Sequence, residues 1–163
     1  MEIFVQPMTE YGYNKLINEL KNLKEVERPN NIKEIDTARE HGDLKENAEY
    51  HAARERQLFL DARINELTQL VAEARVIDPS TITHDKVSFG STITLEDLDS
   101  EEQFCYTIVG ATESNPDKGL ISYHSPLAKQ LLGKVVGDEV TIQLPKGKVD
   151  YEILEICYKE IQF

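Results

Sequence analysis

Two carboxylates fall close together in a polar stretch near the middle of the first half of the chain. The stretch reads Arg39-Glu40-His41-Gly42-Asp43-Leu44-Lys45-Glu46-Asn47-Ala48-Glu49-Tyr50-His51. Asp43 follows directly on a glycine, and Glu46 stands three residues after Asp43. Such hard oxygen ligands suit a magnesium ion, which usually takes one or two protein carboxylates and completes its shell from water and phosphate. Two carboxylates alone would hold it weakly, so the pair would matter where other ligands are already present.

The same spacing has an ordinary structural explanation. Asp43-x-x-Glu46 fits a capping box at the start of a helix. Acidic residues in a first helical turn are favoured by the helix dipole, by about 0.3 to 1 kcal/mol each. On spacing alone, the capping box is the favoured interpretation.

Other motifs for metal or phosphate binding are incomplete. The acidic run 97–102 resembles the opening of a calcium loop, but its sixth position is Glu102 instead of glycine. Two Gly-Lys pairs lack the glycine of a phosphate-binding loop, because Ala128 and Ile142 stand in its place. His41 and His51 are spaced poorly for zinc. We therefore expect no metal site that the chain forms on its own.

The polar stretch lies between two segments with helical periodicity. Thr9 is a suitable helix cap, and an apolar stripe follows it on one face. Pro29 interrupts the stripe, where we expect a bend or a fresh first turn without a chain reversal. A second stripe alternates steps of four and three, as in a coiled coil. The first stripe is Leu16, Leu20, Leu23, Ile32, Ile35 and Ala38, and the second is Leu60, Ile64, Leu67, Val71 and Ala74.

A reversal at His41-Gly42-Asp43 would join these segments into an antiparallel helical hairpin. Each arm has about 30 residues and thus a length of about 45 Å. The residues expected in the seam near the turn are small: Ala48, Ala52 and Ala53. The tip should therefore be slender and exposed, which suits a rod that reaches a partner. A coiled coil that serves for dimerisation or spacing is the alternative.

The second half has a different pattern. Six of the eight glycines and four of the six prolines lie in residues 79–163. Short β-branched runs alternate there with turn clusters, which predicts strands. One helix fits at Ser125–Leu132, with a serine cap, Pro126 at the first helical position and Gly133 after the end. We predict an α+β fold: a helical hairpin domain at residues 1–78 and a compact domain at 79–163 with a mostly antiparallel sheet and one helix. The strand runs are expected at Val87–Phe89, Thr92–Leu95, Phe104–Val109, Gly119–Ser122, Glu139–Leu144 and Tyr151–Ile156.

Composition limits the class of function. The chain has 163 residues, 18 Lys and Arg against 30 Asp and Glu, and a formal charge of -12. This charge disfavours indiscriminate binding to nucleic acid, whose phosphates it repels. No apolar run reaches the roughly 20 residues of a membrane span, and the start resembles no secretory signal. Cys105 and Cys157 are expected as reduced thiols of a cytoplasmic protein, with a single disulfide as the minor alternative.

With these elements in place, the sequence resembles the bacterial Gre transcript-cleavage factors, and the GreA type more closely than the GreB type. The resemblance runs along nearly the whole chain, and the tip segment is its most specific part. A run of that length exceeds what a capping box explains, so it favours function. The matching segments are Met8-Thr9-x-x-Gly12, Leu16-x-x-Glu19-Leu20, Arg28-Pro29, Ala38–Glu55, Val87-x-Phe89-Gly90-Ser91, Ile108-Val109-Gly110 and Ser125-Pro126-Leu127-Ala128.

The resemblance implies a reaction and a place for it. Such factors dock a C-terminal domain, similar in fold to FKBP-type isomerases, on the rim of the secondary channel of RNA polymerase. They thread the hairpin to the active site. The tip acids, Asp43 and Glu46 here, help to hold the second magnesium ion and orient the attacking water. The polymerase then cleaves the 3′ end of backtracked RNA. The chain is thus expected to be no enzyme itself, to bind no cofactor stably and to share Mg²⁺ with the polymerase.

Further positions carry over from the resemblance. Arg39 and Arg54 match basic residues that face the RNA, and surface ion pairs with Glu40 or Glu55 are the alternative. Gly42, Asn47 and Tyr50 are expected to order the tip, although Tyr50 is equally explained as a packing residue. The segment expected to contact the coiled coil at the channel rim contributes Ser125, Pro126, Leu127 and Leu131. A monomer without contact to a membrane is expected.

Two rival functions stay open. The first is a channel-occupying inhibitor of RNA polymerase with the same architecture and no cleavage stimulation. Retention of both tip acids argues against it. The second is a free-standing metal nuclease, which two carboxylates without further ligands make an improbable interpretation.

Overall fold

The computed structural model describes residues 5–43 and 47–163. The chain divides into two compact units, which are described separately: Tyr13–Ala74, and Arg75–Phe163 together with the described residues up to Gly12. The sequence predicts domains at 1–78 and 79–163. In the structure, the described residues up to Gly12 and residues 75–78 belong with the second unit instead. No helix in the described ranges is long and apolar enough to cross a membrane.

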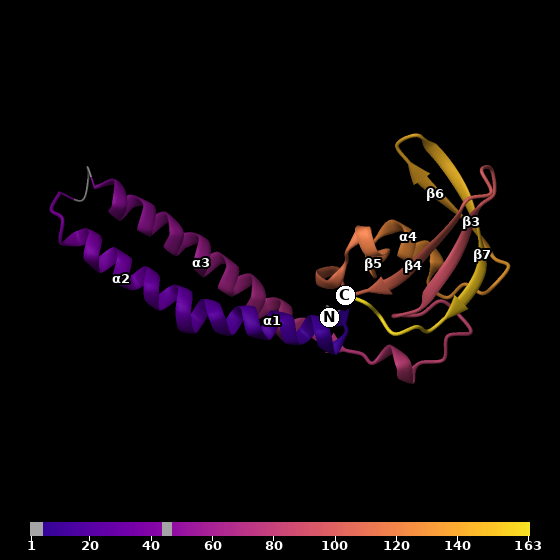
Figure 1. The fold of residues 1–163 in the computed structure, drawn as a ribbon, viewed down its shortest axis with the longest axis horizontal. Helices are drawn as coiled ribbons and strands as arrows, with labels where there is room; N and C mark the ends of the chain where they lie inside the picture. Colours follow the sequence, from indigo (N-terminus) through magenta and orange to yellow (C-terminus); the bar gives the residue numbers. More distant parts are fainter. Residues whose placement is uncertain (1–4, 44–46) are drawn as a thin grey trace. The chain divides into compact units, whose positions relative to one another are not determined.

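The helical unit is a hairpin of two long arms. The first arm consists of α1 (Glu10–Asn22), a π-helical turn (Leu23–Glu27) and α2 (Arg28–Arg39). The second arm is α3 (Ala48–Glu73), which runs beside the first (Figure 1). Thr9 caps α1, because its hydroxyl accepts a hydrogen bond from the Gly12 amide. The predicted hairpin is confirmed, although the second arm ends one residue before Ala74.

The π-helical turn explains how the first arm passes Pro29 without reversing. Proline has no amide hydrogen and its ring clashes with the carbonyl four residues earlier. The turn before it widens, and the Arg28 amide donates to the Leu23 carbonyl five residues back. Pro29 then lies in the first turn of α2, where its missing donor costs nothing. The predicted fresh first turn is confirmed.

The seam between the arms holds most of the predicted apolar residues. Leu16, Ile35, Ala38, Ala53, Leu60, Ile64 and Leu67 are all buried. One position is wrong: Ile32 is 47 % exposed, and Asn31 occupies the seam in its place. Of the three alanines expected near the turn, only Ala53 is buried, whereas Ala48 and Ala52 are exposed. The prediction failed there because adjacent positions of a helix differ by about 100° and only packing decides which one faces the partner.

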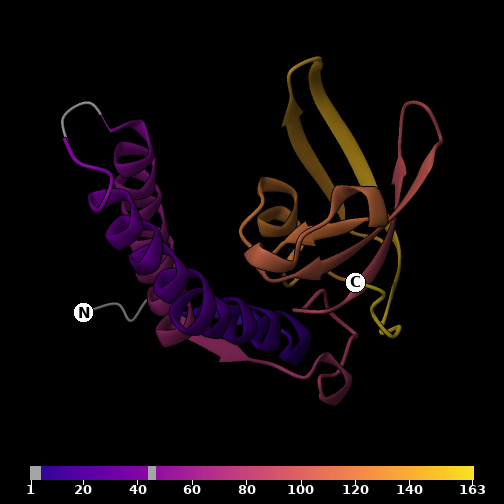
Figure 2. The same cartoon turned by 60° about the vertical axis from the view of Figure 1, so that its left-hand side comes forward.

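The second unit is built on a five-stranded sheet with the order β5-β4-β3-β7-β6. Its pairs are antiparallel except for β4 with β5, which is parallel. The hairpins that join β3 to β4 and β6 to β7 are visible in Figure 2. The strands are β3 (Thr92–Asp97), β4 (Gln103–Val109), β5 (Leu120–Ser122), β6 (Glu139–Leu144) and β7 (Gly147–Cys157). The predicted α+β class and mostly antiparallel sheet are confirmed.

The core of this unit lies between one face of the sheet and the short helix α4 (Pro126–Leu131). Ile93, Leu95, Ile108 and Ile153 from the sheet pack with Ala128 and Leu131 from the helix. The predicted strand at Val87–Phe89 is wrong: the segment is a loop whose apolar side chains are nevertheless buried. Apolar alternation alone did not distinguish a buried loop from a strand.

Both cysteines are free thiols and lie on strands beside β3. Cys105 is exposed, and burial raises the pKa of the Cys157 thiol, with the nearby Glu155 adding to the shift. That both thiols stay reduced in the cell remains a prediction.

A small second sheet pairs β1 (Gln6–Met8) with β2 (Ala74–Val76). Next to it the carboxylate of Glu113 is buried and accepts hydrogen bonds from the Thr9 amide at 2.8 Å and the Gly12 amide at 3.1 Å. The Gly110 amide at 2.8 Å and the Thr9 hydroxyl also donate to it. One side chain thus fixes the first residues of α1 to the loop that follows β4.

Candidate functional site

The turn between α2 and α3 is closed by two residues with different roles. Gly42 has φ of +107°, a left-handed conformation that residues with a side chain rarely adopt. Asn47 is the N-cap of α3, because its Oδ1 accepts from the Tyr50 amide at 3.1 Å. Its Nδ2 donates to the Ala38 carbonyl at 2.5 Å. One amide side chain therefore starts one helix and ties it to the end of the other.

Aromatic and charged side chains pack on this turn. The guanidinium of Arg39 lies over the Tyr50 ring, 5.9 Å from its centroid, in a cation–π contact. Tyr50 also meets His51 edge to face, with their ring centroids 5.7 Å apart. These contacts place the Arg39 guanidinium against the Tyr50 ring at the end of α2. That Tyr50 orders the tip stays a prediction.

Asp43 lies at the exposed end of the hairpin. It lines a shallow hollow together with His41, Asn47, Ala48 and Glu49. His41 and Glu49 are 3.9 Å apart and attract each other when the histidine is protonated. Glu46 is outside the described residues, so its predicted pairing with Asp43 stays a prediction.

The capping-box interpretation of the acidic pair is wrong in one respect. The N-cap of α3 is Asn47, so Asp43 does not cap that helix. Capping of α3 therefore does not explain why an aspartate stands at position 43.

The two predicted basic residues have contacts other than the surface ion pairs that were the alternative interpretation. Arg39 contacts Tyr50, and Arg54 donates to the Gln57 side chain at 2.7 Å. Pairs with Glu40 or Glu55 are absent from the salt bridges of the described part of the chain. Both side chains are exposed to solvent.

Charged side chains bridge the arms behind the tip. Arg63 of α3 donates to both carboxylate oxygens of Glu19 in α1, at 2.9 and 3.1 Å. These hydrogen bonds, and then the one to Glu66, raise the pKa of the Arg63 guanidinium further. Arg56 and Glu27 form a second bridge at 2.6 Å. Because these groups are partly exposed, each bridge contributes at most about 1 kcal/mol, but together they brace the rod.

The segment expected to meet the polymerase rim begins α4. Ser125 caps this helix, since its hydroxyl accepts from the Ala128 amide at 3.2 Å. Pro126 is exposed and Leu127 is half-buried against the core. Leu131 has no exposed surface, so a direct contact by its side chain is not available in this structure. Leu131 instead holds the helix on the sheet.

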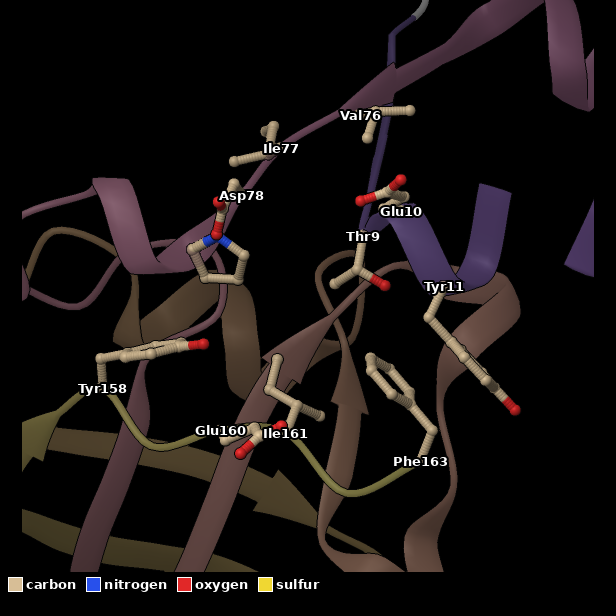
Figure 3. A pocket seen from close by; sticks show the side chains of 11 residues that line it. Thr9, Glu10, Tyr11, Val76, Ile77, Asp78, Tyr158, Glu160, Ile161 and Phe163 are labelled. Atoms are coloured by element: carbon tan, nitrogen blue, oxygen red, sulfur yellow. The ribbon is translucent and has the colours of Figure 1, made fainter. Parts of the chain in front are cut away.

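A separate hollow of about 310 Å³ lies in the sheet unit, near the start of α1 (Figure 3). Tyr11 and Phe163 line it and stack on each other, with ring centroids 4.3 Å apart. Asp78 accepts hydrogen bonds from the Ser80 hydroxyl and amide, which lower the pKa of its carboxyl. Tyr11 and Phe163 thus contact each other, and Asp78 is bonded to Ser80. The tip of the hairpin remains the candidate functional site.

The described residues contain no group of three or more His, Cys, Asp and Glu side chains placed to hold a metal ion. Asp43 fits a magnesium ion only as part of a ligand set that another molecule completes, because it is an exposed carboxylate at the end of a rod.

The structure combines a helical hairpin with an α+β sheet unit. Comparison with protein-family models shows that this combination is that of a class of transcription factor. A profile described as "Transcription elongation factor, N-terminal" matches residues 6–76, and one described as "Transcription elongation factor, GreA/GreB, C-term" matches residues 82–158. The chain belongs to the bacterial GreA/GreB family of transcription elongation factors, and it is of the GreA type. As an elongation factor it acts on RNA polymerase.

Two sequence relatives support the type along nearly the full length. The transcription elongation factor GreA of Wolinella succinogenes is 66 % identical over 97 % of this chain and 98 % of its own. The protein of the same name from Helicobacter pylori strain Shi470 is 63 % identical over 97 % of this chain and 96 % of its own. The crystal structure of GreA factor homolog 1 of Thermus thermophilus aligns with 94 % of this chain and 99 % of its own, at 27 % identity and a TM-score of 0.44.

Two structural residues were missed by the sequence reasoning. Glu113 stands three residues after Gly110, a spacing typical of a local cap, but its bonds to Thr9 and Gly12 join segments about 100 residues apart. Asn31 gave no signal, because a polar residue beside an apolar one is read as the exposed position.

Proposed function

We propose that this chain enters the secondary channel of RNA polymerase and stimulates the polymerase's own cleavage of the 3′ end of backtracked RNA. The observation that carries the proposal is the exposed carboxylate of Asp43 at the end of a braced helical hairpin. Family membership supports it, because the chain is a GreA-type elongation factor over nearly its full length. Cleavage would restore a 3′ end in the active site and rescue arrested complexes.

The tip would supply charge to a site that another protein owns. Asp43 and Glu46 would be the carboxylates offered to a magnesium ion of the polymerase active site, which supplies activation of water and stabilisation of the phosphate charge when bound. Asp43 would also accept a hydrogen bond from the attacking water and hold it in line. Asn47 joins the start of α3 to the end of α2, and would thereby help to position the turn that carries Asp43.

The basic residues beside the turn would meet the RNA. Arg39 is held over Tyr50, from where its guanidinium could reach a phosphate next to the cleaved bond. Arg54, whose side-chain partner Gln57 is neutral, would serve the same purpose. Ser125 and Pro126 would contact the coiled coil at the channel rim.

In this proposal the chain is a factor, and catalysis belongs to the polymerase. It binds no cofactor stably, shares Mg²⁺ only within the complex and works as a monomer in the cytoplasm. Its binding partners are the rim coiled coil, the active site of the polymerase and the nascent RNA 3′ end.

The test is cleavage of a defined backtracked elongation complex. Asp43→Asn and Glu46→Gln keep the size of the side chain and remove its charge. Each should lower the maximal cleavage rate by about a hundredfold, because a charge placed at the reacting phosphate is lost. Glu49→Gln removes a carboxylate at the same tip and should leave the rate near that of the wild type.

Binding is measured separately, by competition with labelled wild-type chain. Unchanged affinity with lost cleavage supports the proposal, whereas wild-type cleavage by both acid variants contradicts it. Slowed nucleotide addition without cleavage by the wild-type chain would instead favour the channel-occupying inhibitor. Cleavage of free RNA with Mg²⁺ and no polymerase would identify a nuclease.

A further inference from the structure

Asn31 is a polar residue in the apolar seam of the helical hairpin. Its side chain is 1 % exposed, although the neighbouring seam positions hold Ile35 and Ala38. The residue it faces across the seam, Ala53, is small and buried as well. A seam residue of this kind has a specific hydrogen-bonding requirement that aliphatic neighbours lack.

Half of that requirement is met across the hairpin. The Asn31 Nδ2 donates to the backbone carbonyl of Ala53 in α3, at 2.9 Å. The Oδ1 atom is buried and has no hydrogen-bond partner among the residues that the structure describes. The orientation of the amide is nevertheless defined, because the opposite one would place two oxygens against each other. The contact therefore joins one atom of α2 to one atom of α3.

Such a contact has a consequence that apolar packing does not. Leucine and isoleucine side chains keep most of their contact energy when one helix shifts slightly along the other. A buried hydrogen bond to a backbone carbonyl is made at one offset only, and single buried asparagines set the register of coiled coils in this way. The ion pairs of the hairpin are partly exposed, so their side chains adjust more easily when one helix shifts along the other.

We propose that Asn31 is a positioning residue: its hydrogen bond to Ala53 sets the axial offset of α2 against α3 and with it the place of Asp43 at the tip. The offset is a property of the free chain. Its effect on cleavage rests on the proposed function.

The unpartnered Oδ1 atom leads to a distinctive expectation for the stability of Asn31 variants. A buried oxygen without a donor lowers stability, so an apolar residue of similar size should stabilise the hairpin. Asn31→Leu is therefore expected to raise the melting temperature by about 2 to 4 °C. It should at the same time widen the distribution of offsets, since the specific contact is gone. A residue with only a structural role would not gain stability and lose geometry together.

The offset is measured on the full chain with spin labels at Lys33→Cys and Glu55→Cys, in a background of Cys105→Ser and Cys157→Ser. Asn31→Leu should broaden or shift the distance between the labels. Asn30→Leu is the matched control, because Asn30 is the preceding residue, of the same type and exposed. It should leave the distance unchanged. Asn31→Ala removes the amide without adding bulk and should also broaden the distance.

Cleavage provides the second readout. At saturating chain, Asn31→Leu should lower the maximal rate by about tenfold or more, because small misplacements of reacting groups are costly. The concentration that gives half of the maximal rate should stay the same, since docking through the sheet unit is untouched. An unchanged label distance in both Asn31 variants overturns the inference, whatever cleavage does. Absence of cleavage by the wild type overturns the proposed function and leaves the distance measurement valid.

Discussion

At the scale of single residues, one buried carboxylate determines how α1 begins. Glu113 accepts hydrogen bonds from Thr9, Gly12 and Gly110, and its own side chain is only 7 % exposed. An anion at a helix N-terminus is favoured by the dipole and by the unpaired amides of the first turn. The motif Met8-Thr9-x-x-Gly12 thus has a structural explanation in a residue 100 positions away.

Position 12 requires a glycine, because the Glu113 side chain occupies the space that a Cβ would fill. A Cβ at this position would lie 2.1 Å from the Glu113 Oε1. We predict that Gly12→Ala lowers the free energy of unfolding by about 2 to 4 kcal/mol, although alanine is favoured over glycine inside helices by about 1 kcal/mol. Denaturant unfolding followed by circular dichroism measures the change.

Asn14→Ala is the control, because Asn14 is exposed on the same helix. It should leave stability unchanged or raise it by a few tenths of a kcal/mol. A Gly12→Ala chain as stable as the control would show that Glu113 moves aside at no cost, and would contradict the explanation.

At the scale of elements, the turn depends on the two functions of Asn47. Its Oδ1 caps α3 and its Nδ2 bonds the Ala38 carbonyl of α2. Asn47→Ala removes both contacts, and we predict a loss of about 1 to 2 kcal/mol in the local stability of the first turn of α3. Amide hydrogen exchange at Tyr50 and His51 reports this loss.

Asn47→Asp separates the two contacts. A carboxylate still caps the helix but cannot donate to Ala38, so exchange at Tyr50 should stay slow. If cleavage falls with Asp as with Ala, the bond between the helices is what positions the tip. Fast exchange in the Asp variant would contradict the assignment of Asn47 as N-cap.

The hairpin was predictable because its pattern is local. Leucines and isoleucines at helical spacing identify both arms, and the glycine between them identifies the reversal. The burial of Asn31 in the seam, where Ile32 was expected, was not predictable. Both positions lie near the same stripe as Ile35, and the small Ala53 leaves room for the asparagine side chain. The sheet of β1 and β2 and the Glu113 contacts join distant segments, which periodicity does not report.

The site was predictable in part. The tip segment pointed to Asn47 through residue type and resemblance, and the structure gives this residue its specific contacts. The role of Asp43 stays a prediction. Leu131 was expected at a contact surface and is instead fully buried. Side-chain direction on a helix as short as α4 depends on the sheet beneath it, which the sequence of the helix does not contain.

At the scale of the whole molecule, the charge decides where the chain meets RNA. Residues 1–78 hold 11 basic and 16 acidic residues, which leaves 7 and 14 of the total 18 and 30 for residues 79–163. Both parts are therefore negative, by 5 and 7 charges, and together they give the formal charge of -12. A chain of this charge repels free RNA. Under the proposed function, the polymerase would hold the RNA next to Arg39 and Arg54.

We therefore predict that the isolated chain does not bind single-stranded RNA, and that lowering the salt does not help. A basic binder gains affinity by orders of magnitude between about 0.2 and 0.05 M salt, because it releases counterions. Here weaker screening extends the repulsion instead. Fluorescence anisotropy of labelled RNA should stay flat at both salt concentrations, with a lysine-rich peptide as positive control. Arg39→Ala and Arg54→Ala should leave that baseline unchanged and lower cleavage only within the polymerase complex. Binding that strengthens at low salt and weakens in these variants would mean that the chain recognises RNA on its own.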